Sequence, residues 1–248
     1  MPDSVLKHPL FVRFTHAMRQ VTLPLRRAAW LLPILAALAA FAPPSVLGDD
    51  PVKNALHAAA AANDPAAIAD LLARGEKIDA GDERGRSALL VATYLDNVEA
   101  ARALIAAGAD VNAKDDREDS PYLYAAAEGR TEILKLTLAA GADLTSTNRY
   151  GGTGLIPAAH HEHPEAVREL LQTAIDVDHV NKLGWTALLE VMILGDGSSG
   201  YIEITRMLVD AGADVNFADK DGVTPLAHAR RQGFQEIIAI LEKAGARP

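Results

Sequence analysis

The sequence contains no cysteine, and aromatic residues make up only 5% of the chain. The absence of cysteine excludes disulfide bonds, thiolate nucleophiles and cysteine-ligated zinc. The sequence also lacks the glycine-rich phosphate loop, the G-x-S-x-G turn of serine hydrolases and the H-E-x-x-H pair of zinc proteases. These absences predict a protein without catalytic residues and without a cofactor.

A basic stripe is absent as well. Of the 24 lysines and arginines, 19 lie in residues 49–248, as do 32 of the 33 acidic residues, so this part has a formal net charge of −13. An acidic surface repels the phosphate backbone of nucleic acids. We therefore expect no nucleic-acid partner.

Residues 1–48 differ in composition from the rest of the chain. Five basic residues are followed by the uncharged apolar run Ala28–Ala42. A basic segment, a short apolar run and small residues are typical of a secretory signal peptide. Pro43 hinders cleavage after the Ala-Phe-Ala sequence, so we predict cleavage after Gly48. A start at Met18 would leave a signal of ordinary length.

An uncleaved membrane anchor is the alternative. Residues 28–48 carry no charge and approach the length that a membrane span needs. Prolines at positions 33, 43 and 44 interrupt them, which favours cleavage. We therefore expect export to the periplasm, with inner-membrane anchoring as the alternative.

A short sequence motif recurs along residues 49–248. It reads Ala-Ala-Gly-Ala-Asp-Val-Asn at residues 106–112, and its glycine position recurs at 75, 108, 141, 174, 212 and 245, with alanine at 174. The steps between these positions are 33, 33, 33, 38 and 33 residues. A fixed period of this length is typical of ankyrin repeats, and residues 49–248 resemble the ankyrin-repeat family.

The resemblance implies an all-α ankyrin-repeat solenoid, in which each repeat is a β-turn finger followed by two antiparallel helices. We place about six repeats in one domain at about 51–80, 82–114, 115–147, 148–180, 181–218 and 219–248. The five extra residues of the fifth repeat fall in 195–200, whose glycines and serines predict a loop between its two helices. In the fourth repeat Ala174 occupies the glycine position of the recurring motif. We therefore expect the second helix of this repeat to end in a different way from those of the other repeats.

The resemblance also implies a partner-binding surface on the concave side, made by the finger tips and the exposed ends of the inner helices. We expect the side chains at these positions to contact solvent in the free protein. The positions that favour binding are Arg84, Arg86, Tyr94, Leu95, Arg117, Arg149, Tyr150, His160, His161, Leu183, Trp185, Ile193 and Leu194.

Trp185 and Tyr150 are the expected anchors of this surface, because tryptophan, tyrosine and arginine dominate protein interfaces. Trp185 is the one tryptophan outside the signal segment. The alternative is structural: these two rings lie over adjacent fingers and stiffen the stack, while Ile193 and Leu194 pack beneath the inserted loop.

The cluster His160-His161-Glu162-His163 is the one place that suggests metal or hydrolytic chemistry. Histidines 160 and 163 would share a helix face and could hold a metal if a third ligand, such as His179, came near. The resemblance to the ankyrin-repeat family implies that His163 corresponds to a structural histidine of that family. We therefore predict no metal site and keep metal binding or hydrolysis as the alternative.

Residues 148–152 and 181–190 also resemble phrases of a bacterial ankyrin subgroup that is often exported. We therefore predict a non-catalytic scaffold of the periplasm or envelope, which binds another envelope protein through the concave face of repeats two to five. The arginines favour an acidic or mixed apolar and acidic partner segment. A self-associating protein and an inhibitor of a secreted toxin are further alternatives.

Overall fold

The computed structural model describes residues 55–247. The chain divides into two units, Met1–Gly48 and Asp49–Pro248, and all described residues belong to the second unit. The predicted signal segment, its cleavage site and the alternative start at Met18 therefore lie outside the described residues. No helix within residues 55–247 is long and apolar enough to cross a membrane.

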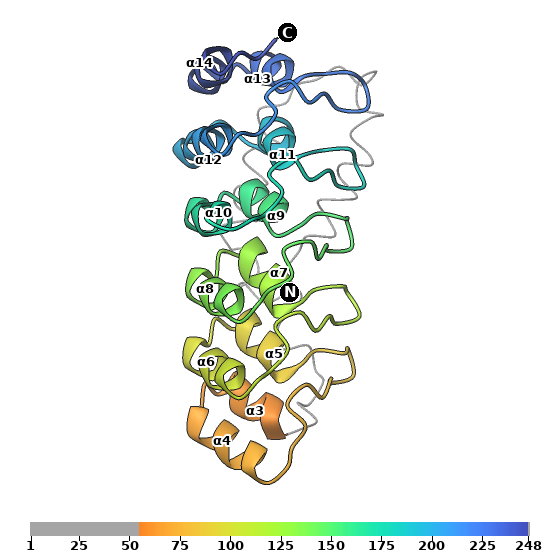
Figure 1. The fold of residues 1–248 in the computed structure, drawn as a ribbon, viewed down its shortest axis with the longest axis vertical. Helices are drawn as coiled ribbons and strands as arrows, with labels where there is room; N and C mark the ends of the chain where they lie inside the picture. Colours follow the sequence, from red (N-terminus) through yellow and green to blue (C-terminus); the bar gives the residue numbers. More distant parts are fainter. Residues whose placement is uncertain (1–54, 248) are drawn as a thin grey trace, which may run out of the picture. The chain divides into compact units, whose positions relative to one another are not determined.

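Twelve helices form six successive pairs in the described part of the chain, which contains no strand. Figure 1 shows the first helices of the pairs stacked in one column, the second helices in another and the fingers on the far side of the first column. This is the predicted all-α solenoid. The inner helices are α3 Ala55–Ala61, α5 Ala88–Tyr94, α7 Pro121–Ala127, α9 Leu155–His160, α11 Ala187–Leu194 and α13 Pro225–Gln232. The outer helices are α4 Pro65–Ala73, α6 Val98–Ala106, α8 Thr131–Ala139, α10 Pro164–Leu171, α12 Ser199–Asp210 and α14 Gln235–Lys243.

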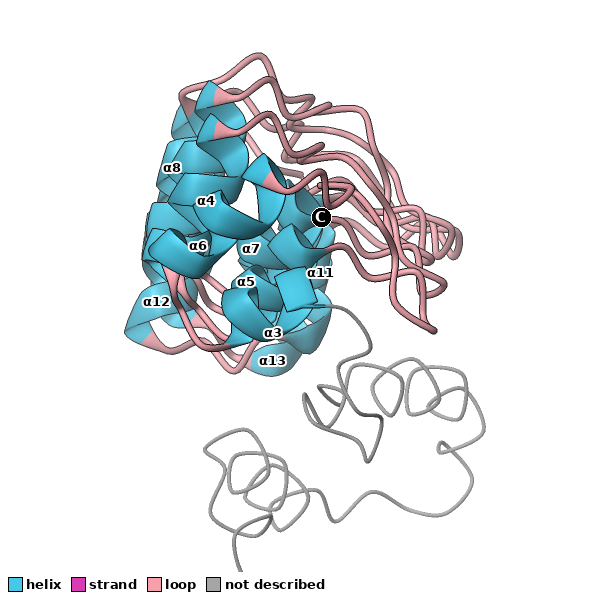
Figure 2. Ribbon diagram, turned by 90° about the horizontal axis from the view of Figure 1, so that it is seen from below, coloured by secondary structure: helices cyan, strands magenta, loops and turns pink. Residues whose placement is uncertain are grey.

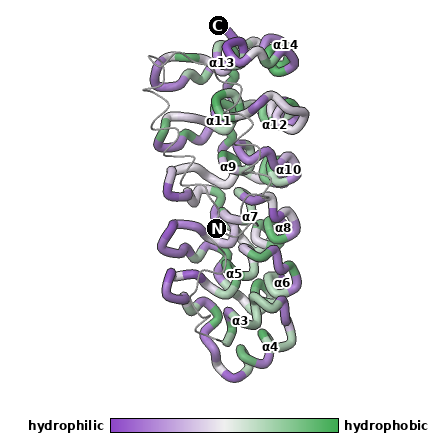
Figure 3. Tube along the Cα trace, turned by 180° about the vertical axis from the view of Figure 1, so that it is seen from behind, coloured by the Kyte–Doolittle hydropathy of each residue, from purple (hydrophilic) through white to green (hydrophobic). Residues whose placement is uncertain are grey.

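One continuous apolar core runs through the stack from Leu56 to Leu241. Each inner helix packs against the inner helices of the neighbouring repeats as well as its own outer helix, so apolar residues face several sides. Fully buried alanines, such as Ala92 and Ala158, let these helices approach closely. Figure 3 shows the resulting pattern, with hydrophobic residues along the helix columns and hydrophilic residues along the fingers.

Each inner helix after a finger is preceded by a serine or threonine that caps its N-terminus, except in repeat four. The side-chain oxygen accepts a hydrogen bond from the backbone N–H three residues later, at 3.1–3.3 Å. Such caps satisfy a backbone donor that the helix itself leaves without a partner. The capping residues are Ser87, Ser120, Thr186 and Thr224.

Repeat four has lost this cap, which gives a matched test. Thr153 occupies the position of Thr186, but its buried hydroxyl makes no hydrogen bond within residues 55–247. Thr186→Val is expected to lower the free energy of unfolding by about 1 kcal/mol, because the amide of Leu189 loses its acceptor. Thr153→Val is expected to cost nothing. Urea denaturation of both variants measures the difference, and equal losses would contradict the role of the cap.

The end of the second helix in repeat four closes by a different device, as the sequence predicts for Ala174. In the other repeats a glycine with φ between 87° and 93° follows the outer helix, a conformation that costs glycine little. In repeat four the hydroxyl of Thr173 donates to the carbonyl of Leu170 at 2.6 Å and accepts from the amide of Ile175 at 3.2 Å. A side chain therefore replaces the backbone freedom of glycine.

The insertion in repeat five is divided between a loop and a helix. Residues 195–198 form the loop between α11 and α12, which agrees with the prediction. Ser199 and Gly200, which the sequence places in the loop, belong instead to the first turn of α12, which has 12 residues against nine in α6 and α8. The Ser198 hydroxyl bonds to the Glu162 carboxylate, so the insertion contacts repeat four.

Candidate functional site

The fingers project from the same side of the solenoid, as Figure 2 shows. Each finger has an aspartate or asparagine at its base, whose Oδ1 accepts hydrogen bonds from the backbone amides two and four residues later at 2.8–3.1 Å. These bonds fix the shape of each finger before any partner binds. The base residues are Asp82, Asp115, Asn148, Asn181 and Asp219. We call the finger tips and the adjoining ends of the inner helices the finger face.

The predicted contact residues lie in the fingers or at the C-terminal ends of the inner helices, and most of them are partly buried. Among the described residues Val180, 39% exposed, is the one exposed large hydrophobic side chain. Tyr150, Leu183 and Trp185 are partly buried on fingers four and five. Leu95, Ile193 and Leu194, at the ends of inner helices, are partly buried as well. These six side chains therefore keep part of their surface in contact with solvent, and part of it is buried in the protein.

The prediction that Tyr94 contributes to the partner-binding surface is wrong. Its side chain is buried, with 3% of the residue exposed, so it offers no surface to a partner. Its hydroxyl donates to Asp115 Oδ2 at 3.0 Å, and its ring packs edge-on against Tyr124 with 4.1 Å between centroids. Tyr94 therefore supports the base of finger three from the helix of the preceding repeat.

Three arginines of the fingers, Arg86, Arg117 and Arg149, have acidic neighbours in their own chain. Arg86 is committed to Asp82 through Nε and Nη2 at 2.7 and 2.6 Å, and both side chains are largely buried. This pair closes finger two, so Arg86 has a structural role there, whereas the sequence predicts it as a contact residue of the partner-binding surface. Arg84, on the same finger, is partly buried.

Asp119 lies between the other two arginines. Arg149 Nη1 is 3.7 Å from Asp119 Oδ1, and Arg117 Nε is 4.0 Å from Oδ2. Both distances exceed hydrogen-bond length. Burial and the charge of Asp115 raise the pKa of Asp119 to about 6, although the two arginines lower it. Arg149 also lies over the ring of Tyr150, 4.8 Å from its centroid, in a cation–π contact.

Fingers four and five are joined to each other. The amide of Lys182 donates to the carbonyl of Tyr150 at 3.0 Å, and Lys182 Nζ donates to the carbonyl of Arg149 at 2.8 Å. Tyr150, Leu183 and Trp185 thus sit on two fingers that hold a fixed relative position. This part of the finger face combines aromatic, aliphatic and basic side chains.

His160 points into the protein and not toward a partner. Its side chain is 12% exposed, and Nδ1 lies 3.4 Å from Glu190 Oε2 on α11. Burial, with the charge of His161, lowers the pKa of His160 to about 3, and burial raises the pKa of Glu190 to about 7 despite the hydrogen bond from Asn181. Although the two groups lie within ion-pair distance, between these values they face each other as neutral groups.

Sequence reasoning missed Glu190. The sequence nevertheless distinguishes this position when equivalent residues of the repeats are compared. Glu190 lies two residues after Leu188, the first apolar residue of its inner helix. The equivalent residues are Val91, Tyr124, Pro157 and His228. An acidic residue at this buried position is unusual and marks a polar cluster.

The other two histidines of the cluster, and the possible third ligand His179, contact separate groups. His161 Nδ1 lies 2.6 Å from the carbonyl of Ala127, and His179 Nε2 lies 2.7 Å from the carbonyl of Gly151. His163 packs on Gly129, and burial lowers its pKa to about 4. Within residues 55–247 no group of three or more histidine, aspartate or glutamate side chains is placed to hold a metal ion.

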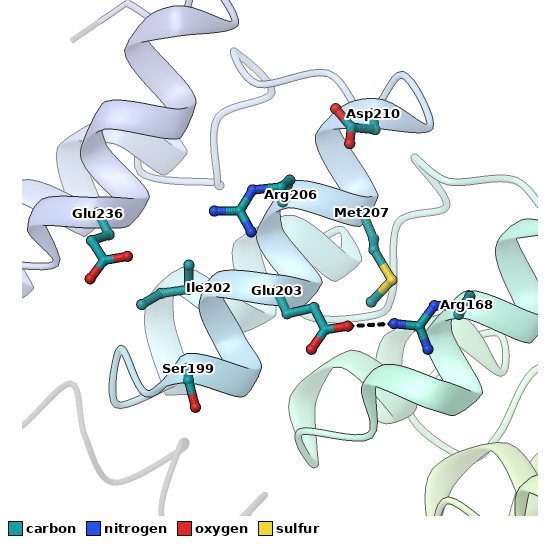
Figure 4. Close-up of a pocket in the computed structure, with 8 residues that line it drawn as sticks. All are labelled: Arg168, Ser199, Ile202, Glu203, Arg206, Met207, Asp210 and Glu236. Carbon is teal, nitrogen blue, oxygen red and sulfur yellow. Dashed lines mark hydrogen bonds and ion pairs between the residues drawn. The ribbon is translucent and has the colours of Figure 1, made fainter.

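A groove of about 690 Å³ lies on the opposite side, over the outer helices α10, α12 and α14 (Figure 4). The Arg168–Glu203 ion pair crosses from α10 to α12 beside it. No predicted site residue lines this groove. Its lining residues are Arg168, Ser199, Ile202, Glu203, Arg206, Met207, Asp210 and Glu236.

Comparison with known proteins agrees with this architecture. The family model described as ankyrin repeats (3 copies) matches residues 33–115 and 122–216. The ankyrin repeat protein YahD of Escherichia coli K12 is 44% identical over 59 residues, which cover 24% of this chain and only 29% of that protein.

Solved structures extend the likeness. An ankyrin repeat domain from Acinetobacter baumannii is 57% identical with a TM-score of 0.76, and the match covers 77% of this chain and 98% of that one. The ankyrin repeat protein EF0377 is 40% identical with a TM-score of 0.73, over 76% of this chain and 96% of that one. The ankyrin repeat domain of Bcl-3, 24% identical with a TM-score of 0.71 over 80% and 89%, shares the fold. The chain therefore belongs to the ankyrin-repeat family.

Proposed function

We propose that this chain is a non-catalytic scaffold that binds another protein through the finger face of repeats two to five. Ankyrin repeats generally mediate binding between proteins. The observation that carries the proposal is the placement of Trp185, Tyr150 and Leu183 on two fingers that hydrogen bonds join. Rigid aromatic side chains bind with little loss of conformational entropy.

The partner segment is acidic or mixed apolar and acidic. Arg117 and Arg149, on neighbouring fingers, both lie near the carboxylate of Asp119, at 4.0 and 3.7 Å. Two arginines in this position can bind a partner carboxylate through charge-assisted hydrogen bonds. The apolar part of the segment would cover Tyr150 and Trp185.

The proposed location is the periplasm, and the proposed partner is an envelope protein. The support is the composition of residues 1–48, whose basic and apolar parts are typical of a signal peptide. Sequencing of the N-terminus of protein isolated from cells tests this. A mature chain that starts at Asp49 supports export with cleavage, whereas an intact N-terminus in the membrane fraction supports anchoring.

Crosslinking in cells, affinity capture and mass spectrometry test the binding surface. The Trp185→Ala, Tyr150→Ala double variant is expected to lose at least ten-fold of the captured partner, since each aromatic anchor contributes up to a few kcal/mol. The matched control is Ile202→Ala, Met207→Ala, which removes apolar side chains from the outer groove.

The control variant is expected to capture the partner as the unchanged protein does. Equal capture by the finger-face variant, with unchanged circular dichroism, contradicts the proposed surface. Loss of capture by the control alone would assign binding to the outer groove.

A further inference from the structure

Finger five depends on a side chain of its own inner helix. Asn181 Oδ1 accepts from the amides of Leu183 and Trp185 at 2.9 and 3.1 Å. The same side chain donates through Nδ2 to Glu190 Oε1 at 2.8 Å. The orientation of Asn181, and with it the position of the Trp185 backbone, is therefore set by Glu190.

In three other fingers, a different kind of side chain bonds to the base residue. In finger two the second carboxylate oxygen of the base residue Asp82 bonds to Arg86, and in finger six that of Asp219 bonds to His228. In finger three the hydroxyl of Tyr94 supports the base residue Asp115. Of these four side chains that bond to a base residue, Glu190 of finger five is the one that carries a carboxyl group.

Within residues 55–247, His160 is the one basic group at ion-pair distance from Glu190. Glu190 is 5% exposed, and its partners are Asn181 and, at 3.4 Å, His160, which burial keeps neutral above a pKa of about 3. None of the other titratable or charged side chains on elements packed against α11 bonds to Glu190 in the described part of the chain. They are Tyr201, Glu203, Arg206 and Asp210 of α12 and His228, Arg230 and Arg231 of α13.

The first turn of α12, which continues past the insertion of repeat five, contacts the helix that carries His160. Tyr201 Oη donates to the backbone carbonyl of His160 at 2.6 Å, so the start of α12 holds the backbone of the residue that faces Glu190. Of the two side chains that face Glu190, Asn181 is the one that bonds to finger five, so a change in charge on Glu190 reaches the finger through Asn181.

We propose that Glu190 is a positioning residue of the partner-binding surface, whose ionisation loosens finger five and displaces Trp185, so that partner binding weakens as the pH rises. An ionised carboxylate without a nearby cation is costly in a buried site. It draws in water or turns toward solvent, and either response disturbs the Asn181 side chain that holds Leu183 and Trp185. The effect on partner binding rests on the proposed function, whereas the movement of finger five does not.

Tryptophan fluorescence tests the movement without any partner. In the full chain with Trp30→Phe, Trp185 is the single tryptophan. Its emission maximum is expected to shift to longer wavelength between pH 5 and 9, with a midpoint near 7, where burial places the pKa of Glu190. Glu190→Gln, which keeps the acceptor for Asn181, is expected to abolish the shift.

The matched control is His228→Gln, which removes a titratable group from the equivalent position of repeat six. It is expected to keep the shift. A shift that persists in Glu190→Gln, or the absence of a shift in the unchanged protein, overturns the proposal. Because no partner takes part, failure of the capture experiment leaves this result unaffected.

Amide hydrogen exchange gives a second measurement that needs no change at Glu190. The amides of Leu183 and Trp185 are compared with those of Arg84 and Arg86, which bond to Asp82 in the same way. The ratio of the two exchange rates corrects for the intrinsic effect of pH. The ratio is expected to rise at least ten-fold above pH 7, and a constant ratio overturns the proposal.

Discussion

Leu134→Ala is expected to lower the free energy of unfolding by about 3 kcal/mol, because its fully buried side chain leaves a cavity in the middle of the stack. Leu134 lies on α8, which packs against α6 and α10 as well as α7. In a solenoid each repeat is stabilised by its neighbours. The cavity therefore weakens contacts in both directions along the stack, and urea denaturation followed by circular dichroism measures the loss.

The matched control is Leu241→Ala on α14, where the leucine is equally buried. Repeat six has a described neighbour on one side only, so its unfolding can separate from that of the other repeats. The control is expected to produce an early, partial transition and a main transition close to that of the unchanged protein. A single transition shifted equally by both substitutions would show that the stack unfolds as one unit.

Most of the fold follows from local signals in the sequence. The 33-residue period, the capping residues Ser87 and Thr224 and the glycines after the outer helices act over a few residues, so each repeat specifies its own turns and helix ends. The altered end at Ala174 is predictable for the same reason. Which residue replaces the glycine is less predictable, because Thr173 acts through its hydroxyl and not through backbone freedom.

The candidate site is less predictable, because burial depends on contacts between repeats. Tyr94 occupies a position that the repeat pattern assigns to the surface, yet the base of finger three, 21 residues later, covers its hydroxyl. Likewise the neighbours of Arg117 and Arg149 become visible only when Asp119 is placed between two fingers. A residue-by-residue comparison of the repeats would have revealed Glu190, but not its contact with His160.

Glu190→Gln is expected to raise the free energy of unfolding by about 3 kcal/mol at pH 8. Burial raises the pKa of Glu190 from 4.5 to about 7, despite the hydrogen bond from Asn181. Each unit of difference between the folded and unfolded pKa corresponds to about 1.4 kcal/mol. Glutamine has a similar shape, can accept the bond from Asn181 and carries no charge into the buried site.

The sign follows from proton binding. Between about pH 4.5 and 7 the folded chain holds a proton on Glu190 that the unfolded chain releases, so this group favours the folded state less and less as the pH rises. Its contribution is fully present below pH 4.5 and lost above 7. The stability curves of the unchanged protein and of Glu190→Gln are therefore expected to coincide near pH 4 and to separate progressively up to pH 8.

Asp82→Asn is the control with the opposite sign. Burial raises the pKa of Asp82, but the hydrogen bonds from the Arg86 side chain and from the amides of Arg84 and Arg86 outweigh it and leave the pKa below its ordinary value. Loss of this carboxylate is expected to destabilise the protein at pH 8 and to matter less as the pH falls below 4. Denaturation curves at several pH values compare the two variants. If the curve of Glu190→Gln stays parallel to that of the unchanged protein, Glu190 is already ionised in the folded state, and the electrostatic basis for the movement of finger five is lost.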